Sequence, residues 1–564
     1  MSKIVIYQVL PRLFGNINPK CKPWGSKDEN GVGKFSDFTP EILSGIKELS
    51  VTHIWYTGIL EHATATDYSA YGITPDNKYV IKGLAGSPYA IKDYYDVDPD
   101  LATDVSSRKS EFCELIKRTH AAGMKVVIDF VPNHVARQYN SDSAPQGVLS
   151  LGSNDNELLS FSPQNNFYYL PDTEFAPSFY IGDGEEHYIE YPAKVTGNNC
   201  FSASPSVNDW YETIKLNYGV DYSNGNSSFD PMPDTWKKML DILLYWASKG
   251  VDAFRCDMAE MIPVEFWQWS IYQVKRQYPD ITFIAEVYNP SQYDDYIKRG
   301  GFDYLYDKVG LYDTLRAILS ESLPAGAITR CWQSIESVKE NMLHFTENHD
   351  EQRSASNPFG GDAMRAFPLF AVSALIDKNP IMLYFGQELG ERGEESEGFS
   401  GLDGRTTIFD YWSIPSVRRL VTKGKRGLTA YEKKVRTQYE KLLAIATKQD
   451  GISNGDFFDL MYVNHKSPGF NPYSNYLFAR RYKATLYIIG VNFWAGETVA
   501  RINIPAHLFE HWKIKEGEYC CHELLTKQNK EVEISTSVMF DIRILPYGTT
   551  VWKCDRKKHK ITSK

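Results

Sequence analysis

Four segments, far apart in the chain, each place acidic, basic or histidine side chains at the end of an apolar run. Runs this rich in Val, Ile and Phe are typical of strands that are buried on both faces of a parallel sheet. When parallel strands close into a barrel, the side chains at their carboxyl ends meet at one rim, where barrel enzymes carry their chemistry. The sequence therefore predicts such a barrel, with a polar site at one end. The segments are 126–134, 250–257, 283–287 and 345–350.

Strand-like and helix-like segments alternate through the first part of the chain. Such alternation predicts parallel strands covered by helices. It resumes with an amphipathic helix over 235–248, and a charged amphipathic helix over 429–447 is expected to close the barrel. Earlier strands are expected at 4–9, 53–56 and 125–131, helices at 41–49 and 108–122, and later strands at Ala253, Thr282, Tyr304, Leu343 and Ile381.

Two parts of the chain depart from this alternation. Between residue 134 and about residue 206, helical periodicity is absent and Asn, Ser, Asp, Gly, Pro and Tyr dominate. An irregular segment this long is either functional or a small inserted domain. After residue 451, β-rich runs such as 476–482 and 485–491 follow one another with turn residues and no intervening helix, as in a sandwich domain.

The size and charge of the chain narrow its function. A chain of 564 residues exceeds what one hydrophobic core usually supports, so two or three domains are expected. The net charge is −10 and the positive residues are scattered, which argues against a nucleic-acid surface. The most apolar internal window falls short of a membrane span, and the apolar run at the N-terminus is too short and interrupted for a signal peptide.

The cysteines agree with an intracellular location. The chain has eight, and none are paired in a Cys-x-x-Cys spacing, so neither a zinc site nor a disulfide framework is indicated. Free thiols in a reducing compartment are the simplest interpretation. We therefore expect a cytoplasmic protein, unless a leader has been removed.

The segment 250–257 supplies the first candidate catalytic pair. Arg255 and Asp257 are two residues apart on a predicted strand, so both side chains point to the same face. The cation would keep the carboxylate ionised and oriented, as a nucleophile requires. A structural ion pair is the alternative interpretation of this segment taken alone.

Two further acids end their own predicted strands. Glu286 has apolar neighbours, which favour a protonated carboxyl that can give its proton to a leaving-group oxygen. Asp350 follows His349, and alone such a pair is more often structural than catalytic. Together with Asp257, these acids would meet at one rim, an arrangement that suits glycoside hydrolysis. The spacing of the carboxyl groups decides between retention and inversion at the sugar carbon.

The four segments resemble, in order and spacing, the four signature regions of the α-amylase family, glycoside hydrolase family 13. Residues 89–94, with the sequence Tyr-Ala-Ile-Lys-Asp-Tyr, look like the family's Tyr-x-Ile-x-Asp-Tyr segment. Residues 383–388 resemble its late Tyr-x-Gly-x-Glu segment. The resemblance extends from Tyr7 to the C-terminal β-rich part.

The resemblance implies a role for each acid of the predicted site. It makes Asp257 the nucleophile, Glu286 the general acid and base, and Asp350 the acid that orients and distorts the sugar. Arg255 would hold the nucleophile, and Asp129 would support the site by contacting Arg255. An oxocarbenium-like transition state is stabilised by nearby carboxylates, which agrees with these roles.

The resemblance also implies the residues that bind the sugar. His134 and His349 would bind sugar hydroxyls, and Tyr89 would stack on the ring, whose apolar face suits an aromatic platform. Many relatives carry Lys-His after the nucleophile segment to contact the leaving-group sugar. Here those positions are Glu260 and Met261, which leaves endo-action on starch open.

Two positions bear on metals. Asn133 matches a family position that often binds calcium between barrel and inserted segment, although a structural Asn at a strand end is an equal alternative. A second calcium loop of some relatives has Lys34 in place of its last Asp, and an ammonium there argues against that site. We expect no required cofactor, with a structural calcium near Asn133 as the alternative.

The complete prediction is an α/β protein built on a (β/α)8 TIM barrel, with an inserted subdomain after strand 3 and a C-terminal antiparallel β-sandwich. The expected limits are 1–133 and 216–451 for the barrel, 134–215 for the inserted subdomain and 452–564 for the C-terminal domain.

The predicted activity is retaining cleavage of α-glucosidic bonds in maltooligosaccharides or soluble α-glucans, with neither nucleic acid nor membrane as partner. A transglycosylase, a sugar isomerase on the same scaffold and an inactive sugar-binding homologue are the alternatives. Chain-length preference, linkage preference and oligomeric state are left open.

Overall fold

Eight parallel strands form the central sheet of the computed structural model, which describes residues 3–179 and 188–557. The strand order is β15–β14–β13–β12–β5–β2–β1–β16. A parallel bridge between His344 and Ile381 joins the two edges, because the Met382 N–H donates to the His344 carbonyl at 2.8 Å. The predicted barrel is therefore confirmed. Its strands are β1 (Val5–Val9), β2 (His53–Tyr56), β5 (Lys125–Phe130), β12 (Ala253–Cys256), β13 (Thr282–Ala285), β14 (Tyr304–Tyr306), β15 (Met342–Leu343) and β16 (Ile381–Tyr384).

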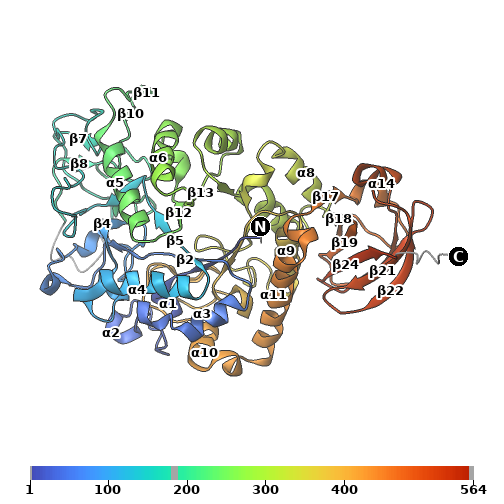
Figure 1. Cartoon of the computed structure of the whole chain (residues 1–564). Helices are drawn as coiled ribbons and strands as arrows, with labels where there is room; N and C mark the ends of the chain where they lie inside the picture. Colours follow the sequence, from blue (N-terminus) through green and yellow to red (C-terminus); the bar gives the residue numbers. More distant parts are fainter. Residues whose placement is uncertain (1–2, 180–187, 558–564) are drawn as a thin grey trace.

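Helices surround this sheet (Figure 1). The predicted helices over 108–122, 235–248 and 429–447 are confirmed, each with ends that differ by no more than a residue. A capping box formed by Thr429 and Glu432 fixes the start of the last one. Within the described part of the chain, no helix has both the length and the apolarity needed to cross a bilayer. The main helices are α3 (Pro40–Lys47), α4 (Arg108–Ala121), α5 (Asp234–Ser248), α6 (Val264–Gln277), α7 (Asp313–Leu319), α8 (Ala327–Ser334), α9 (Ala363–Leu375), α10 (Pro415–Lys423) and α11 (Ala430–Lys448).

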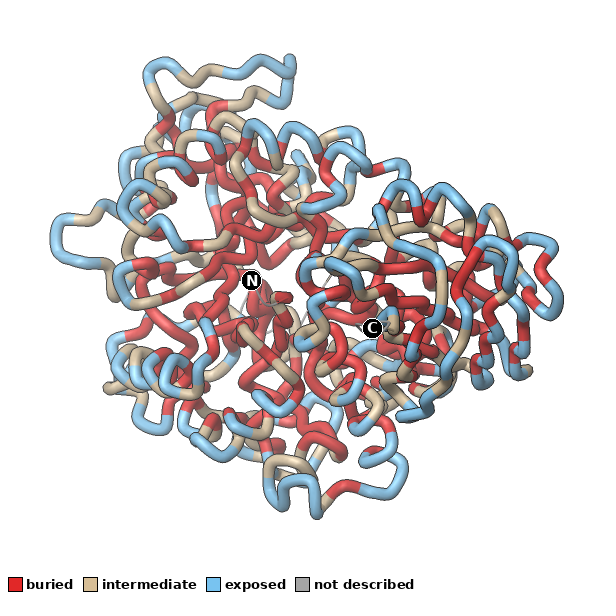
Figure 2. Tube along the Cα trace, turned by 45° about the vertical axis from the view of Figure 1, so that its right-hand side comes forward, coloured by how far each residue is buried: buried red, intermediate tan, exposed pale blue. Residues whose placement is uncertain are grey.

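The two faces of each barrel strand enter different cores. On β12, Ala253 belongs to the apolar cluster inside the barrel, whereas Phe254 and Cys256 belong to the larger cluster between strands and helices. Because side chains alternate along a strand, Arg255 and Asp257 point inward with Ala253. The prediction that they share the interior face is confirmed. Figure 2 shows buried residues concentrated along the inner strands and exposed ones on the outer helices and loops.

The segment that follows β5 contains short strand pairs and, in its described residues, no long helix. Two of these, β6 (His134–Ala136) and β9 (Thr213–Lys215), pair in antiparallel fashion and hold the two ends of the segment together. A second pair is β7 (Tyr169–Leu170) with β8 (Ala193–Lys194), and a third is β10 (Val220–Asp221) with β11 (Asn226–Ser227). The expected domain limits stay predictions, but the loss of regular structure begins where the sequence placed it.

The C-terminal part is antiparallel, as predicted, and lies at the right of Figure 1. Six strands form one sheet in the order β17–β18–β19–β24–β21–β22, and β20 pairs with β23 in a second. The expected absence of intervening helices is wrong, because α14 (Ala506–Trp512) connects β20 to β21. The strands are β17 (Asp456–Asp459), β18 (Asn475–Tyr482), β19 (Thr485–Asn492), β20 (Thr498–Ile502), β21 (Gly517–Glu523), β22 (Asn529–Ile534), β23 (Phe540–Ile544) and β24 (Thr549–Arg556).

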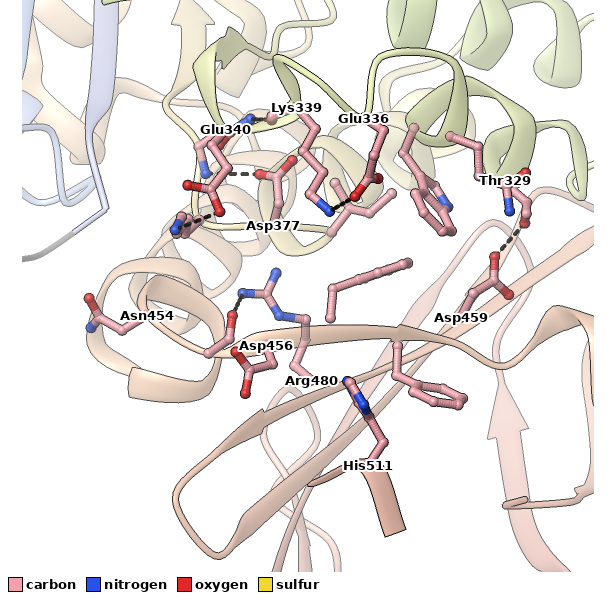
Figure 3. Close-up of a pocket in the computed structure, with 18 of the residues that line it drawn as sticks. Thr329, Glu336, Lys339, Glu340, Asp377, Asn454, Asp456, Asp459, Arg480 and His511 are labelled. Carbon is pink, nitrogen blue, oxygen red and sulfur yellow. Dashed lines mark hydrogen bonds and ion pairs between the residues drawn. The ribbon is translucent and has the colours of Figure 1, made fainter. Parts of the chain in front are cut away.

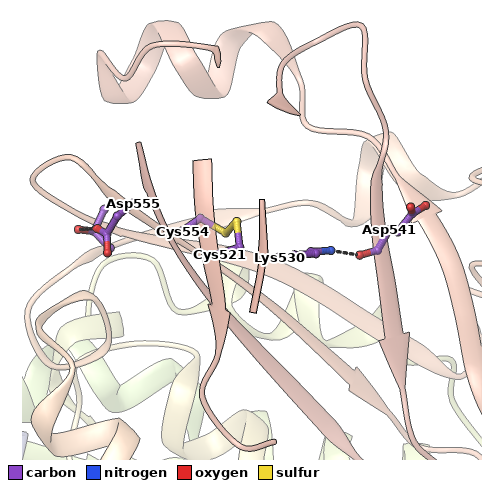
Figure 4. The surroundings of a disulfide bond; sticks show 6 residues. Cys521, Lys530, Asp541, Cys554 and Asp555 are labelled. Atoms are coloured by element: carbon purple, nitrogen blue, oxygen red, sulfur yellow. Dashed lines mark hydrogen bonds between the residues drawn. A yellow bond between two sulfur atoms is a disulfide. The ribbon is translucent and has the colours of Figure 1, made fainter. Parts of the chain in front are cut away.

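A disulfide joins two strands of this sheet. Cys521 on β21 lies directly opposite Cys554 on β24, and their sulfur atoms are bonded (Figure 4). The expectation that all cysteines are free thiols is therefore wrong for this pair. Sequence spacing did not reveal it because β21 and β24 become neighbours only through the strand order of the folded sheet.

A cavity of about 670 Å³ separates part of the barrel from the C-terminal sheet. Figure 3 shows Lys339 and Asp377 on its barrel side and Arg480 and His511 on the other. Arg480 is 1% exposed and donates to the backbone carbonyls of Ile452 at 3.0 Å and Gly455 at 2.7 Å. This guanidinium therefore anchors β18 to the segment that leaves the barrel.

Candidate active site

Arg255, at the end of β12, organises the rim of the barrel. It is 0% exposed, and its Nη1 lies 2.7 Å from Asp257 Oδ1 and 3.3 Å from Asp129 Oδ1. Its Nη2 lies 2.7 Å from Glu286 Oε2. Three acids from three neighbouring strands, β5, β12 and β13, thus share one guanidinium. The convergence that the sequence predicted for Asp257 and Glu286 is present.

Aromatic rings surround the same cation. The guanidinium carbon lies 5.3 Å from the ring centre of Trp55, 5.5 Å from that of Tyr89 and 5.4 Å from that of Tyr306. Arg255 Nε also donates to the Tyr306 hydroxyl at 3.2 Å. Rings at this distance attract a cation and exclude water, so Arg255 is held rigidly where its charge acts most strongly.

Two of the acids that share Arg255 have raised pKa values. Burial raises the pKa of Asp257 well above its ordinary value, an effect that Arg255 opposes and that Glu286 and Asp350 reinforce. Burial likewise raises the pKa of Asp129 to about 6, against the stabilising influence of Arg255. One cation shared among several carboxylates does not fully offset their burial, which differs from the expectation that Arg255 keeps Asp257 ionised.

Glu286 has more polar surroundings than its sequence neighbours suggested. Its Oε2 accepts a hydrogen bond from the backbone N–H of Met258 at 2.8 Å, besides its contact with Arg255. Its Oε1 accepts one from the Tyr288 hydroxyl at 2.6 Å. Its apolar sequence neighbours are thus only part of its environment, because the loops that follow β12 and β13 also direct donors at this carboxyl group.

His349 and Asp350 extend the site toward solvent. The side chain of Asp350 is 44% exposed, compared with 9% for Asp257 and 5% for Glu286. His349 Nε2 lies 3.1 Å from Asp350 Oδ2, and Gln8 Nε2 lies 2.8 Å from His349 Nδ1. Burial, helped by Arg255, lowers the pKa of His349 well below its usual value. A neutral imidazole that accepts at Nδ1 carries its proton on Nε2, facing Asp350.

The other two predicted sugar-binding residues lie beside this group. The Tyr89 ring stacks on the His349 ring with centroids 5.0 Å apart, and its hydroxyl donates to Asp129 Oδ1 at 3.3 Å. His134 is 3% exposed, and burial lowers its pKa to about 3. Its ring lies 5.2 Å from that of Trp210. The sugar-binding roles of Tyr89 and His134 stay predictions.

Sequence reasoning missed several residues of the site. Trp55 and Tyr306 each lie near the carboxyl end of a barrel strand, the same signal that identified the acids. Gln8, on β1, was likewise readable as an inward-facing polar residue on an apolar strand. Tyr288 could not be found in this way, because its contact with Glu286 depends on the path of the loop after β13.

Asn133, the candidate calcium ligand, has a different partner. It is 0% exposed, and its Oδ1 accepts a hydrogen bond from Lys215 Nζ at 2.5 Å. Its Nδ2 donates to the Gly197 carbonyl at 2.9 Å. Calcium requires six to eight oxygen ligands, whereas the single amide oxygen here is occupied by an ammonium group. The residues around Asn133 therefore do not fit a calcium ion.

Glu260, which lies where many relatives are expected to carry a residue that contacts the leaving-group sugar, binds backbone groups of this chain instead. Its Oε2 accepts hydrogen bonds from the backbone N–H groups of Tyr288 and Asn289, each at 2.9 Å. The carboxylate therefore caps the loop that carries Tyr288, and so supports the position of Glu286. This arrangement gives Glu260 a structural role that its sequence position did not reveal.

Comparisons with known proteins agree with this geometry. The family model described as "Alpha amylase, catalytic domain" matches residues 8–477. The chain is 24% identical to "Alpha-amylase 3" of Dictyoglomus thermophilum over 472 residues, which are 80% of this chain and 78% of that protein. It is 21% identical to "Intracellular maltogenic amylase" of Bacillus subtilis over 404 residues, which are 70% of this chain and 56% of that protein. The chain thus spans just over half the length of this second relative.

Solved structures show a similar fold. A "noncanonic maltogenic alpha-amylase" from Thermotoga neapolitana superposes with a TM-score of 0.62 at 18% identity, over 98% of this chain and 99% of that chain. An α-amylase from Geobacillus thermoleovorans, complexed with acarbose, gives a TM-score of 0.63 at 17% identity, over 99% of both chains. At these identities the likeness concerns the fold alone.

Proposed function

Because the chain belongs to the α-amylase family of glycoside hydrolases, we propose that it cleaves α-1,4-glucosidic bonds with retention, through a covalent glucosyl-enzyme intermediate. The substrates would be maltooligosaccharides or soluble α-glucans. The observation that carries the proposal is the pairing of Asp257 and Glu286 on one guanidinium, with Asp350 beside them. Two carboxyl groups held on one cation suit the short spacing of retaining enzymes, about 5–5.5 Å, better than the wider spacing of inverting ones.

The reaction divides between the two buried acids. Asp257 attacks the anomeric carbon while Glu286 gives its proton to the departing oxygen, so a glycosyl ester forms as the glucosidic bond breaks. Glu286 then takes a proton from water, whose oxygen displaces Asp257 and restores both groups. Positive charge that develops on the sugar ring relieves the repulsion among carboxylates that share Arg255, which stabilises the transition state.

The remaining residues would position the sugar. Asp350 is the most exposed of the three acids, so it is the one placed to meet hydroxyl groups of an entering sugar. His349 presents its Nε2 proton beside Asp350, and Gln8 fixes that tautomer. We assign His134 and Tyr89 to the same subsite as a hydroxyl ligand and an aromatic platform.

We further propose that the protein acts in the cytoplasm without a resident cofactor and without calcium at Asn133. A relative described as intracellular supports the location. The disulfide between Cys521 and Cys554 points the other way, since such bonds are uncommon in reducing compartments. The Lys215 ammonium at Asn133 supports independence from calcium at that position.

The experiment that tests the reaction follows anomeric products by NMR while the protein acts on maltooligosaccharides of defined length. Early formation of α-products supports retention, whereas β-products would defeat the mechanism. Products longer than the substrate would identify the transglycosylase alternative, and a moved linkage without net hydrolysis would identify the isomerase. If the folded protein showed no turnover, the remaining alternative would be an inactive sugar-binding homologue.

Substitutions test the assigned acids. Asp257→Asn and Glu286→Gln should each reduce turnover by roughly 10²–10⁴-fold while the protein stays folded. Asp303→Asn is the matched control, since Asp303 lies at the amino end of β14 and pairs with Lys275 at 2.8 Å. Near-normal turnover in either catalytic variant would reject the role assigned to that acid.

A further inference from the structure

The antiparallel pair of strands β3 (Leu60–His62) and β4 (Ile91–Val97) carries three buried acids that the proposed reaction does not use. Glu61 is 1% exposed, and Asp93 and Asp96 are both 0% exposed. One carboxylate oxygen of each lies within 4.8 Å of those of the other two. Buried carboxylates this close repel one another unless a positive charge or a proton lies among them.

The strand register explains why the acids meet. Glu61 lies directly opposite Asp93 on the antiparallel partner strand, whereas Leu60 lies opposite Val97. The residues between 93 and 97 therefore bulge out of the ladder, which brings Asp96 to the same side as Glu61. Like charges directly opposite each other on paired strands are destabilising, so the fold must offset this arrangement.

Neighbouring donors serve two of the acids and leave the third alone. Asp93 Oδ1 accepts a hydrogen bond from the Ser141 hydroxyl at 2.6 Å. Arg108 binds both oxygens of Asp96, at 2.6 and 3.0 Å. Both oxygens of Glu61 are buried and have no hydrogen-bond partner among the described residues. A buried carboxylate that receives no donor is costly, and here it is aimed at two other carboxylates.

We propose that Glu61, Asp93 and Asp96 bind one divalent cation, calcium by preference, which holds β3 and β4 together. Three carboxylates and the one guanidinium of Arg108 leave a charge that a divalent ion neutralises. Oxygen atoms within 4.8 Å of one another can surround a cation at roughly the 2.3–2.6 Å that calcium uses. Lys92, the nearest ammonium along β4, is occupied by Asp76 at 3.0 Å.

The competing occupant is a proton. Burial, followed by the charges of Asp96 and Asp93, raises the pKa of Glu61 to about 9. Without a cation, Glu61 would therefore be neutral at ordinary pH, and the cluster would need no metal. The two occupants differ in a measurable way, because a metal adds mass, scattering and a dependence of stability on ion concentration.

The test begins with the full chain purified without chelators. Elemental analysis should find about one equivalent of calcium, and chelation at elevated temperature should remove it and lower the melting temperature. Added calcium should restore the melting temperature. Crystals grown with calcium or terbium should show an anomalous peak between Glu61, Asp93 and Asp96, a result that needs no variant.

Glu61→Gln keeps the shape of the side chain and should weaken calcium binding by tenfold or more, roughly the scale for loss of a supporting group. Glu397→Gln is the matched control, because burial also raises the pKa of Glu397 to about 9 and it is 5% exposed. The control should keep the metal. Absence of metal and of any calcium effect on the wild-type melting temperature would overturn the proposal, as would an anomalous peak elsewhere with none at Glu61.

Discussion

The replacement of Arg255 by methionine tests whether three acids share one cation. Arg255 is 0% exposed and lies 2.7 Å from both Asp257 and Glu286 and 3.3 Å from Asp129. Methionine fills a similar volume but leaves these acids without the shared guanidinium. Removal of one partner from a buried ion pair costs about 3–5 kcal/mol, so Arg255→Met should reduce the free energy of unfolding by that amount near pH 8.

The loss should depend on pH in a definite direction. Burial already raises the folded-state pKa of Asp257 and that of Asp129, the latter to about 6, and removal of Arg255 raises both further. When the pKa of a carboxyl group is higher in the folded state than in the unfolded state, the group stabilises the fold fully at a pH below its unfolded-state pKa. This contribution is lost as the pH rises through the folded-state pKa. The cost at pH 8 should therefore be the roughly 3–5 kcal/mol expected when one partner of a buried ion pair is removed. Near pH 4 most of that cost should disappear.

Urea denaturation followed by tryptophan fluorescence, at about pH 4.5 and about pH 8, measures this difference. Arg353→Met is the matched control, since Arg353 is also 0% exposed but its ion pair joins it to one carboxylate, that of Glu347, at 3.1 Å. Its cost should vary less with pH. If the cost of Arg255→Met were under about 1 kcal/mol at pH 8, or equal at both pH values, the description of a shared cation would be wrong.

Three other predictions follow from individual contacts. Gln8→Leu removes the hydrogen-bond donor to His349 Nδ1, so kcat/KM for maltooligosaccharides should fall by about tenfold while the fluorescence spectrum stays unchanged. Unchanged kinetics would contradict the assigned His349 tautomer. Burial lowers the pKa of Lys215 to about 7, so the folded state binds fewer protons than the unfolded state above this pH. The free energy of unfolding, measured with urea, should therefore rise between pH 7 and pH 10 by up to about 1.4 kcal/mol for each pH unit. Lys215→Met should abolish this rise. Cys521→Ser should reduce the free energy of unfolding by roughly 3–4 kcal/mol, because it removes a crosslink between residues 33 positions apart in the chain. When the wild-type chain is denatured without reduction and alkylated, mass spectrometry should find Cys521 and Cys554 unmodified.

The acids of the site could be located from sequence because strand geometry alone relates them. Arg255 and Asp257 share a face by their spacing of two, and each acid follows an apolar run whose end marks the barrel rim. The ends of β2 and of α4 agree with the sequence to within a residue, since the apolar pattern stops where the element stops. Local rules were sufficient for these features.

Contacts between residues that lie far apart in the sequence could not be predicted. Lys215 reaches Asn133 because β9 pairs with β6 across the whole inserted segment. Cys521 meets Cys554 because the last strand inserts between β19 and β21. In both cases the partners are set by strand order, and no local pattern of side chains encodes that order.

The positions of two lysines distinguish the region around Asn133 and Lys34 from the cluster of three acids. At both positions where the family resemblance pointed to calcium, a lysine ammonium is present: Lys215 on Asn133, and Lys34, which donates to the Asp100 carbonyl at 2.5 Å. A single positive charge suffices there, because the acceptors are neutral oxygens. The oxygens of Glu61 differ, since they are charged and have no hydrogen-bond partner within the described residues. If ammonium groups replace divalent ions where the acceptors are neutral, then a site of three carboxylates is where a divalent ion is still needed.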